Sequence, residues 1–257
     1  MVRQAPAEKV LVVIPTYNER DNLEPIVQRL FDALPEANVL VVDDGSPDGT
    51  GAVADRLAAS DDRVNVLHRT EKAGLGAAYV AGFEWALARD YTAIMEMDAD
   101  GSHAPEDLPR LVGMLGDDGT GADVVLGSRY VTGGRTVNWP WYREFLSRGA
   151  NVYSKLALGV PINDITSGYR VYRREVLETV QLHNIASQGY CFQVDLALRA
   201  VVAGFVVVEA PITFVERELG ASKMDADIVR EALLRVTTWG LRRRAEQAAG
   251  TVRALLP

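Results

Sequence analysis

The chain has 257 residues, of which 48% are hydrophobic and 24% are charged, a composition typical of a globular protein whose core is large enough to fold without disulfides. Its single cysteine, Cys191, excludes an intramolecular disulfide and favours a reducing compartment. No apolar run reaches the roughly 18 residues of a membrane-spanning helix, and residues 1–9 lack the apolar core of a secretion signal. The net charge of −8 argues against nucleic acid as a partner. We therefore expect a cytoplasmic protein.

The first half of the chain alternates short apolar runs with helical patterns. The runs predict strands over residues 10–14, 39–42, 64–67, 93–97 and 124–126, and the patterns between them predict helices at about residues 23–34, 50–59, 75–88 and 106–115. Strands this apolar, separated by helices, predict an α/β fold with a mainly parallel, Rossmann-like sheet flanked by helices. Ligands of such sheets bind beyond the carboxyl ends of the strands, so we examined the residues that follow each strand.

The second half loses this regular alternation. After an irregular stretch at residues 132–140, apolar residues recur at helical spacing over 142–158, and two further helical patterns, a strand at 206–208 and an amphipathic helix over 225–256 follow. Without a repeat or a linker, the sequence predicts one domain over residues 1–223 and a C-terminal amphipathic helical tail over 224–257 that is not a separate domain. Residues 129–174 hold eight basic and two acidic side chains, a balance of +6 that fits either phosphate binding or a solvated face.

Two aspartates, Asp98 and Asp100, directly follow the predicted strand that ends at Met97. Side chains at positions i and i+2 of an extended backbone point to the same side, and two carboxylates placed in this way repel each other unless a positive charge lies between them. A hard divalent cation, Mg²⁺ or Mn²⁺, meets this need with oxygen ligands. The alternative is a polar turn with two solvated aspartates.

Two other polar loops follow predicted strands. Residues 15–19 leave the first strand through a proline, and Tyr17 offers a ring face and a hydroxyl. The second strand ends in Asp43 and Asp44, whose carboxylates can accept hydrogen bonds from a base or a ribose. Taken singly, the first loop is also typical of a helix cap and the second of an Asx turn. Because the loops leave the same edge of the predicted sheet, together they favour a binding site.

These motifs, in this order, resemble the signature of family 2 glycosyltransferases with the GT-A fold. The residues that carry the resemblance are 15–19 (PTYNE), 42–46 (VDDGS), 72–76 (KAGLG), 97–100 (MDAD) and 127–130 (GSRY). Within that family, residues 138–143 (NWPWYR), 166–169 (TSGY) and 222–223 (SK) are similar to the polyprenyl-phosphate (dolichyl-phosphate) mannose synthases. The resemblance extends from about Val10 to Lys223, which is most of the chain.

The resemblance implies a role for each matching residue. Around the guanosine of a GDP-sugar it places Pro15, Tyr17, Glu19, Val42 and Asp44. It assigns the metal to Asp98 and Asp100, the ribose contact to Ala99, the donor phosphates to Arg129, Arg217 and Lys223, and the acceptor phosphate to Arg143 and Ser147. The family often has a glutamine as a third metal ligand where this chain has Ser102. Ser102 is therefore a candidate third ligand, with water or His103 as the alternatives.

The implied reaction transfers mannose from GDP-mannose to a polyprenyl monophosphate, with metal dependence and inversion at the sugar carbon. Asp100, Arg143, Arg217 and Lys223 are the implied catalytic residues, and a phosphate with a second pKa near ~6 needs no general base. The alternative within the family is a polyprenyl-phosphate glucosyltransferase that uses UDP-glucose. A nucleotidyltransferase is disfavoured because residues 15–19 are not a glycine-rich loop, and a silent binding module because both aspartates are present.

A lipid acceptor implies contact with a membrane. The amphipathic segments 142–158 and 225–256 can lie in the interface with their arginines toward headgroups, or both can pack on the sheet. For Arg148 we favour an ordinary surface position. We expect a protein that is peripherally associated with the cytoplasmic face of the membrane, with a membrane-protein partner as a candidate anchor.

Overall fold

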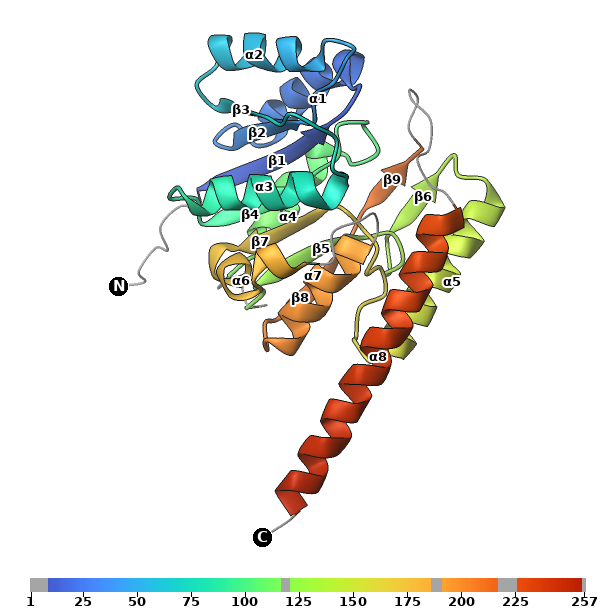
Figure 1. Cartoon of the computed structure of the whole chain (residues 1–257). Helices are drawn as coiled ribbons and strands as arrows, with labels where there is room; N and C mark the ends of the chain where they lie inside the picture. Colours follow the sequence, from blue (N-terminus) through green and yellow to red (C-terminus); the bar gives the residue numbers. More distant parts are fainter. Residues whose placement is uncertain (1–8, 117–120, 186–190, 217–225, 256–257) are drawn as a thin grey trace.

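The computed structural model describes residues 9–116, 121–185, 191–216 and 226–255 (Figure 1). Its centre is a seven-stranded sheet in the order β3-β2-β1-β4-β7-β5-β8, and β6 and β9 form a separate pair. The strands of the large sheet are β1 (Val10–Thr16), β2 (Asn38–Asp43), β3 (Val64–His68), β4 (Ala93–Glu96), β5 (Val124–Ser128), β7 (Arg170–Arg173) and β8 (Val207–Pro211). All of its pairs are parallel except those of β7, which runs antiparallel to β4 and β5. The predicted α/β fold with a mainly parallel sheet is confirmed.

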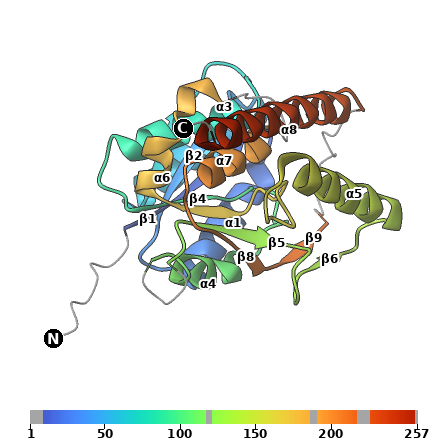
Figure 2. The ribbon, with the colours of Figure 1, turned by 90° about the horizontal axis from the view of Figure 1, so that it is seen from below.

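Helices cover both faces of this sheet (Figure 2). One face carries α1 (Arg20–Ala33), α2 (Thr50–Ser60) and α4 (Leu108–Gly113), and the other carries α3 (Leu75–Leu87), α6 (Arg174–Thr179) and α7 (Cys191–Val202). The short 3-10 helices Pro105–Asp107 and Leu182–Asn184 complete the connections. Alternation along β1 explains the two cores, because Val12 packs with α1 whereas Val13 packs with α3. Gly82 of α3 permits this close packing, since an added Cβ would lie 2.5 Å from Val13 Cγ1.

One strand of the centre, β7, is absent from the sequence prediction. Two of its four residues are arginines, a composition that is atypical of a buried strand. Arg170 is nevertheless fully buried, because its guanidinium donates to the backbone oxygens of Ile165, Ser167 and Gln193 at 2.6, 2.6 and 2.8 Å. The pairing of β6 (Arg135–Val137) with β9 (Thr213–Val215) was likewise not predicted.

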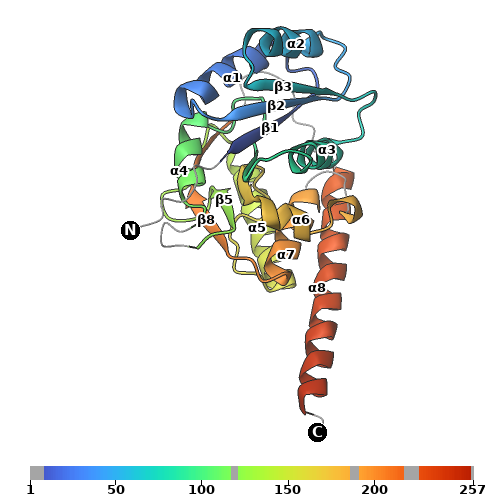
Figure 3. The ribbon, with the colours of Figure 1, turned by 90° about the vertical axis from the view of Figure 1, so that its left-hand side faces the viewer.

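The two long helices of the second half pack against each other. The predicted helix over residues 142–158 is α5 (Trp141–Leu158), and the predicted tail helix is α8 (Ala226–Leu255). Gly240 lets α8 approach closely, since an added Cβ would overlap the backbone oxygen of Ala157. Arg243 and Arg244 donate to the backbone oxygens of Leu158 and Leu156 at 2.9 and 3.0 Å. The far end of α8 extends beyond the rest of the fold (Figures 1 and 3).

No helix in the described part of the chain is both long enough and apolar enough to cross a membrane. The division into residues 1–223 and a tail over 224–257 stays a prediction. Cys191, at the start of α7, is buried.

Candidate functional site

The loops after β1 and β2 meet at the carboxyl edge of the sheet, as the sequence predicted. The backbone N–H groups of Asn18 and Glu19 donate to the side chains of Ser46 and Thr50 at 3.0 and 2.9 Å. Register explains the meeting, because Thr16 at the end of β1 lies beside Asp43 at the end of β2, and their side chains are 2.9 Å apart. The two loops therefore form one connected rim.

Charged groups surround the side chains predicted to contact a nucleoside. Asp44 is buried beside Arg69, whose Nη1 lies 2.7 Å from Asp44 Oδ1. Burial raises the pKa of Asp44, and the positive charge of Arg69 opposes that rise. Lys72 Nζ lies 4.0 Å from the centre of the Tyr17 ring. This corner of the rim thus combines an aromatic face, a carboxylate and two cations.

Two of the predicted nucleotide contacts have apolar side chains that are buried in the cores. Val42 is fully buried in the core, and Ala99 is 3% exposed in the core of the opposite face. Motif position alone does not distinguish a side chain that points out of a sheet edge from one that points into a core. Pro15, Tyr17 and Glu19 are partly exposed. The contacts of all five with a nucleotide remain predictions.

Asp98 and Asp100 follow β4 at the same edge, in the loop where they were predicted. Tyr79 Oη lies 3.2 Å from Asp98 Oδ1, and the backbone N–H of Asp98 donates to His103 Nδ1 at 3.2 Å. Ser102 is 2% exposed, and its hydroxyl and backbone N–H both donate to Asp100 Oδ1. The carboxylates are thus held by surrounding donors.

The donor set fits a hard divalent cation only in part. Two carboxylates are the oxygen ligands that Mg²⁺ or Mn²⁺ prefers, but no cluster of three or more His, Cys, Asp or Glu side chains around one point occurs in the described residues. His103 is a poor third ligand because its Nδ1 accepts the Asp98 N–H at 3.2 Å and its side chain is only 2% exposed. A cation here would take its remaining ligands from Ser102, water or a bound diphosphate.

A buried polar cluster that sequence reasoning missed lies beneath this loop. Glu96 of β4 is fully buried and accepts hydrogen bonds from Tyr172 Oη at 2.9 Å and Gln193 Nε2 at 2.5 Å. Burial raises the pKa of Glu96 to about 7, although the charge of Arg170 opposes the rise. The signal was available, because a glutamate inside an apolar strand needs partners. Through Arg170 the cluster orders residues 165–169, where an added Cβ on Gly168 would lie 4.0 Å from Asp98 Oδ2.

The two basic residues predicted to bind phosphate that the structure describes, Arg129 and Arg143, are paired with carboxylates. Arg129 Nε and Nη2 lie 2.7 and 2.6 Å from the two oxygens of Asp164, and both side chains are buried. On α5, Arg143 donates to both oxygens of Glu216, and Ser147 Oγ accepts from Tyr130 Oη at 2.7 Å. Arg148 pairs with Glu144 on the same helix and is exposed, as expected for a surface position.

The ring of Trp139 joins the two phosphate candidates, because the guanidinium carbons of Arg129 and Arg143 lie 5.3 and 4.3 Å from its centre. The structure therefore brings Arg129, Arg143 and Ser147 into one region, but their contacts with phosphate remain predictions. Arg217 and Lys223 lie outside the described residues.

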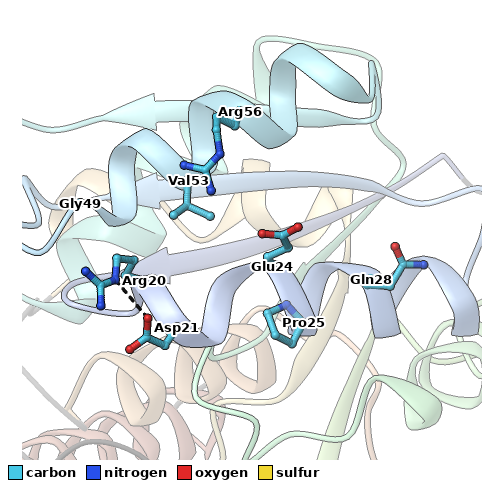
Figure 4. Close-up of a pocket in the computed structure, with 8 residues that line it drawn as sticks. All are labelled: Arg20, Asp21, Glu24, Pro25, Gln28, Gly49, Val53 and Arg56. Atoms are coloured by element: carbon cyan, nitrogen blue, oxygen red, sulfur yellow. Dashed lines mark hydrogen bonds and ion pairs between the residues drawn. The ribbon is translucent and has the colours of Figure 1, made fainter.

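A groove of about 710 Å³ lies elsewhere in the described structure, between α1 and α2 (Figure 4). It is lined by side chains of both signs, among them Arg20, Glu24 and Arg56, and contains none of the predicted site residues.

Comparisons with known proteins identify the family of the chain. The sequence model described as Glycosyl transferase family 2 matches residues 11–181. The chain is 60% identical over 249 residues to a polyprenol monophosphomannose synthase of Mycolicibacterium smegmatis, with coverage of 96% of this chain and 93% of the relative. It is 54% identical to an undecaprenyl-phosphate mannosyltransferase of Micrococcus luteus, with coverage of 93% and 96%.

Two similar solved structures extend the comparison to the fold. A mannosyltransferase from Pyrobaculum calidifontis in complex with GDP-Man and Mn²⁺ has a TM-score of 0.56 and 18% identity, covering 96% of this chain and 81% of that one. Glucosyl-3-phosphoglycerate synthase from Mycobacterium tuberculosis, in complex with Mn²⁺, uridine diphosphate and glucosyl-3-phosphoglycerate, has a TM-score of 0.65 and 19% identity, covering 92% of this chain and 80% of that one. At these identities the likeness concerns the fold.

Proposed function

The chain belongs to glycosyl transferase family 2, and from this membership we propose that it transfers mannose from GDP-mannose to a polyprenyl monophosphate. The observation that carries the proposal is the 60% identity, over 96% of the chain, to a relative named for polyprenol monophosphomannose synthesis. Both sequence relatives compared above are named for mannose transfer, at 60% and 54% identity, and this favours mannose over the UDP-glucose alternative.

The donor would lie along the rim formed by the loops after β1, β2 and β4. Tyr17, Glu19 and Asp44 would face the nucleoside, and Asp98 with Asp100 would hold Mg²⁺ or Mn²⁺ beside the diphosphate. When bound, the cation neutralises charge that develops on the departing GDP. Arg217 and Lys223 would add positive charge there, an assignment that follows from the resemblance.

The acceptor phosphate would bind at Arg143 and Ser147, beside the Trp139 ring that Arg129 also approaches. A guanidinium fork matches phosphate oxygens, and a partly buried arginine offsets the repulsion between an anionic acceptor and an anionic donor.

In the proposed reaction one bond breaks, between the sugar carbon and the GDP oxygen, as a bond forms from the acceptor phosphate oxygen on the opposite face of the sugar carbon. The product is β-linked, and an acceptor that is already ionised at pH 7 transfers no proton to the protein.

The outward face of α5 supports association with a membrane surface. Its exposed side chains are mainly apolar and recur at helical spacing, with Trp141 79% exposed, whereas Asn151 and Ser154 face inward. The apolar members of this α5 stripe are Trp141, Tyr142, Phe145, Leu146, Val152, Tyr153 and Leu156. An apolar stripe on the outside is the reverse of ordinary packing against a sheet. We propose that it lies in the interface of the cytoplasmic leaflet, where a membrane-protein partner could add further anchoring.

Turnover with a short polyprenyl phosphate tests the activity. The measurement compares GDP-mannose with UDP-glucose, each with Mn²⁺, with Mg²⁺ and with a chelator. We expect metal-dependent transfer from GDP-mannose alone. Transfer from UDP-glucose at an equal or higher rate would refute the mannose assignment.

Flotation with anionic liposomes tests the membrane surface separately. Phe145→Glu should reduce flotation, whereas Val202→Glu, which replaces an exposed apolar residue on α7, should not. If the wild-type protein stays fully in the soluble fraction with acceptor lipid present, the interfacial position of α5 is wrong.

A further inference from the structure

The ion pair between Arg143 and Glu216 joins α5 to the segment that follows β9. Nη1 of Arg143 donates to both carboxylate oxygens of Glu216, and its guanidinium carbon lies 4.3 Å from the centre of the Trp139 ring. The proposed function places the acceptor phosphate at this same arginine. A carboxylate of the chain therefore already occupies the cation that an anionic acceptor needs.

Burial distinguishes this pair from the neighbouring pair of Arg129 and Asp164. The side chains of Arg129 and Asp164 are 8% and 0% exposed, and those of Arg143 and Glu216 are 21% and 26% exposed. Separating the buried pair would leave an uncompensated charge in the interior, which is strongly unfavourable. A released Glu216 carboxylate can be hydrated where it stands. Of these two pairs, the one at Arg143 is the one that an incoming anion can exchange.

A second observation beside the pair points to a ligand that accepts hydrogen bonds. The indole N–H of Trp139 is buried and has no hydrogen-bond partner among the described residues. Indole nitrogen can only donate, and a buried donor without an acceptor is unfavourable. A phosphate monoester has three terminal oxygens where a carboxylate has two. It can bind the Arg143 guanidinium and still offer an acceptor to a neighbouring donor.

We propose that Glu216 is an internal substitute for the acceptor phosphate, which pairs with Arg143 in the free enzyme and is displaced by the dianionic monoester. This rests on the proposed function, in which Arg143 receives the acceptor. Because the acceptor must displace Glu216 from Arg143 in order to bind, Glu216 raises the acceptor concentration needed for half-maximal activity. It also makes the site selective, since an alcohol or a singly charged lipid competes poorly with a carboxylate for a guanidinium.

Steady-state kinetics of Glu216→Gln test the proposal, with Glu144→Gln as the matched control. Glu144 lies on α5 and pairs with Arg148, so its variant makes the same change in charge without freeing Arg143. We expect Glu216→Gln to lower the acceptor KM about three- to tenfold with kcat and the GDP-mannose KM nearly unchanged, and Glu144→Gln to shift the acceptor KM less than about twofold. An acceptor KM that rises, or that changes equally in both variants, would overturn the proposal.

Binding of inorganic phosphate, measured by calorimetry, needs no turnover and separates this proposal from the proposed function. Phosphate should bind Glu216→Gln more tightly than wild type, Glu216→Asp should resemble wild type because it keeps the charge, and Arg143→Gln should abolish the difference. If wild type fails to transfer mannose but this pattern holds, the proposed function fails and the exchange at Arg143 stands. Equal phosphate affinity in wild type and a folded Glu216→Gln would refute the exchange.

Discussion

Asp164→Asn is expected to destabilise the fold severely while hardly changing the shape of the residue. Asp164 is fully buried, and its carboxylate accepts the backbone N–H, Nε and Nη2 of Arg129 at 2.9, 2.7 and 2.6 Å. Asparagine removes the negative charge and places an N–H₂ group against at least one of these donors. The Arg129 guanidinium, 8% exposed, is then left without its counter-ion.

The magnitude follows from the burial of the pair. Removing one partner of a buried ion pair costs about 3–5 kcal/mol, and each kcal/mol lowers the melting temperature of a chain of this size by about 2–4 °C. We expect Asp164→Asn to melt about 6–20 °C below wild type in a thermal scan followed by circular dichroism.

Two further variants make the experiment decisive. Asp21→Asn removes a carboxylate that pairs with Arg20 at the surface and should leave the melting temperature within experimental error. Adding Arg129→Met to Asp164→Asn removes the unpaired charge and should recover part of the loss. The reasoning is refuted if Asp164→Asn melts within about 2 °C of wild type, or if the double variant is less stable than the single one by the full cost of a second mutation.

Three other substitutions test the metal site and two close approaches. Asp100→Asn should abolish metal-dependent transfer in the mannosyltransferase assay while leaving the thermal transition near that of wild type, because the carboxylate is partly exposed. Gly82→Ala should cost about 1–3 kcal/mol in a urea titration, since its Cβ would lie 2.5 Å from Val13 Cγ1 in a packed core. Gly240→Ala should loosen α8, because its Cβ would overlap the backbone oxygen of Ala157, and hydrogen exchange of α8 amides should accelerate.

The two glycine substitutions each have an internal control. Gly113→Ala on α4 and Gly149→Ala on α5 add the same methyl group where nothing lies within 4 Å, so both should be neutral or stabilising by up to about 1 kcal/mol. If Gly149→Ala accelerates exchange in α8 as much as Gly240→Ala does, the close approach at Gly240 is not what holds the helix. Near-normal transfer by Asp100→Asn would contradict the metal assignment.

Local sequence patterns were sufficient to predict the parallel strands of the sheet and the polar loops at its edge. The apolar runs of β1, β2 and β4 are continuous because both faces of each strand are buried, and such runs are visible in a single sequence. Since parallel strands end at one edge, the convergence of Tyr17, Asp44 and Asp98 follows from the order of the motifs.

The antiparallel strand β7 could not be predicted, because its stability depends on residues distant in the sequence. Arg170 is compatible with a central strand only when Glu96 and three backbone oxygens surround it, and Gln193, which completes the cluster, is 23 residues away. The ion pairs of the predicted phosphate-binding arginines likewise depend on residues distant in the sequence. Arg129 and Arg143 were predicted to bind phosphate from their motifs, but their partners Asp164 and Glu216 lie 35 and 73 residues further along the chain.

The position of the tail helix shows why amphipathic pattern alone left two alternatives open. An apolar stripe on α5 is equally compatible with packing on a sheet and with a lipid surface, because both bury apolar area. The distinguishing features are small or polar residues: Gly240 admits the backbone of α5, and Arg243 and Arg244 bind the backbone oxygens at its end. Tyr153 of α5 also bonds to Thr237 of α8, so α8 covers one flank of α5, whereas Asn151 contacts Thr166 instead. The other large apolar side chains of α5, from Trp141 to Leu146 and at Val152 and Leu156, stay exposed. The helix that carries Arg143 therefore also carries the apolar surface that we propose meets the membrane.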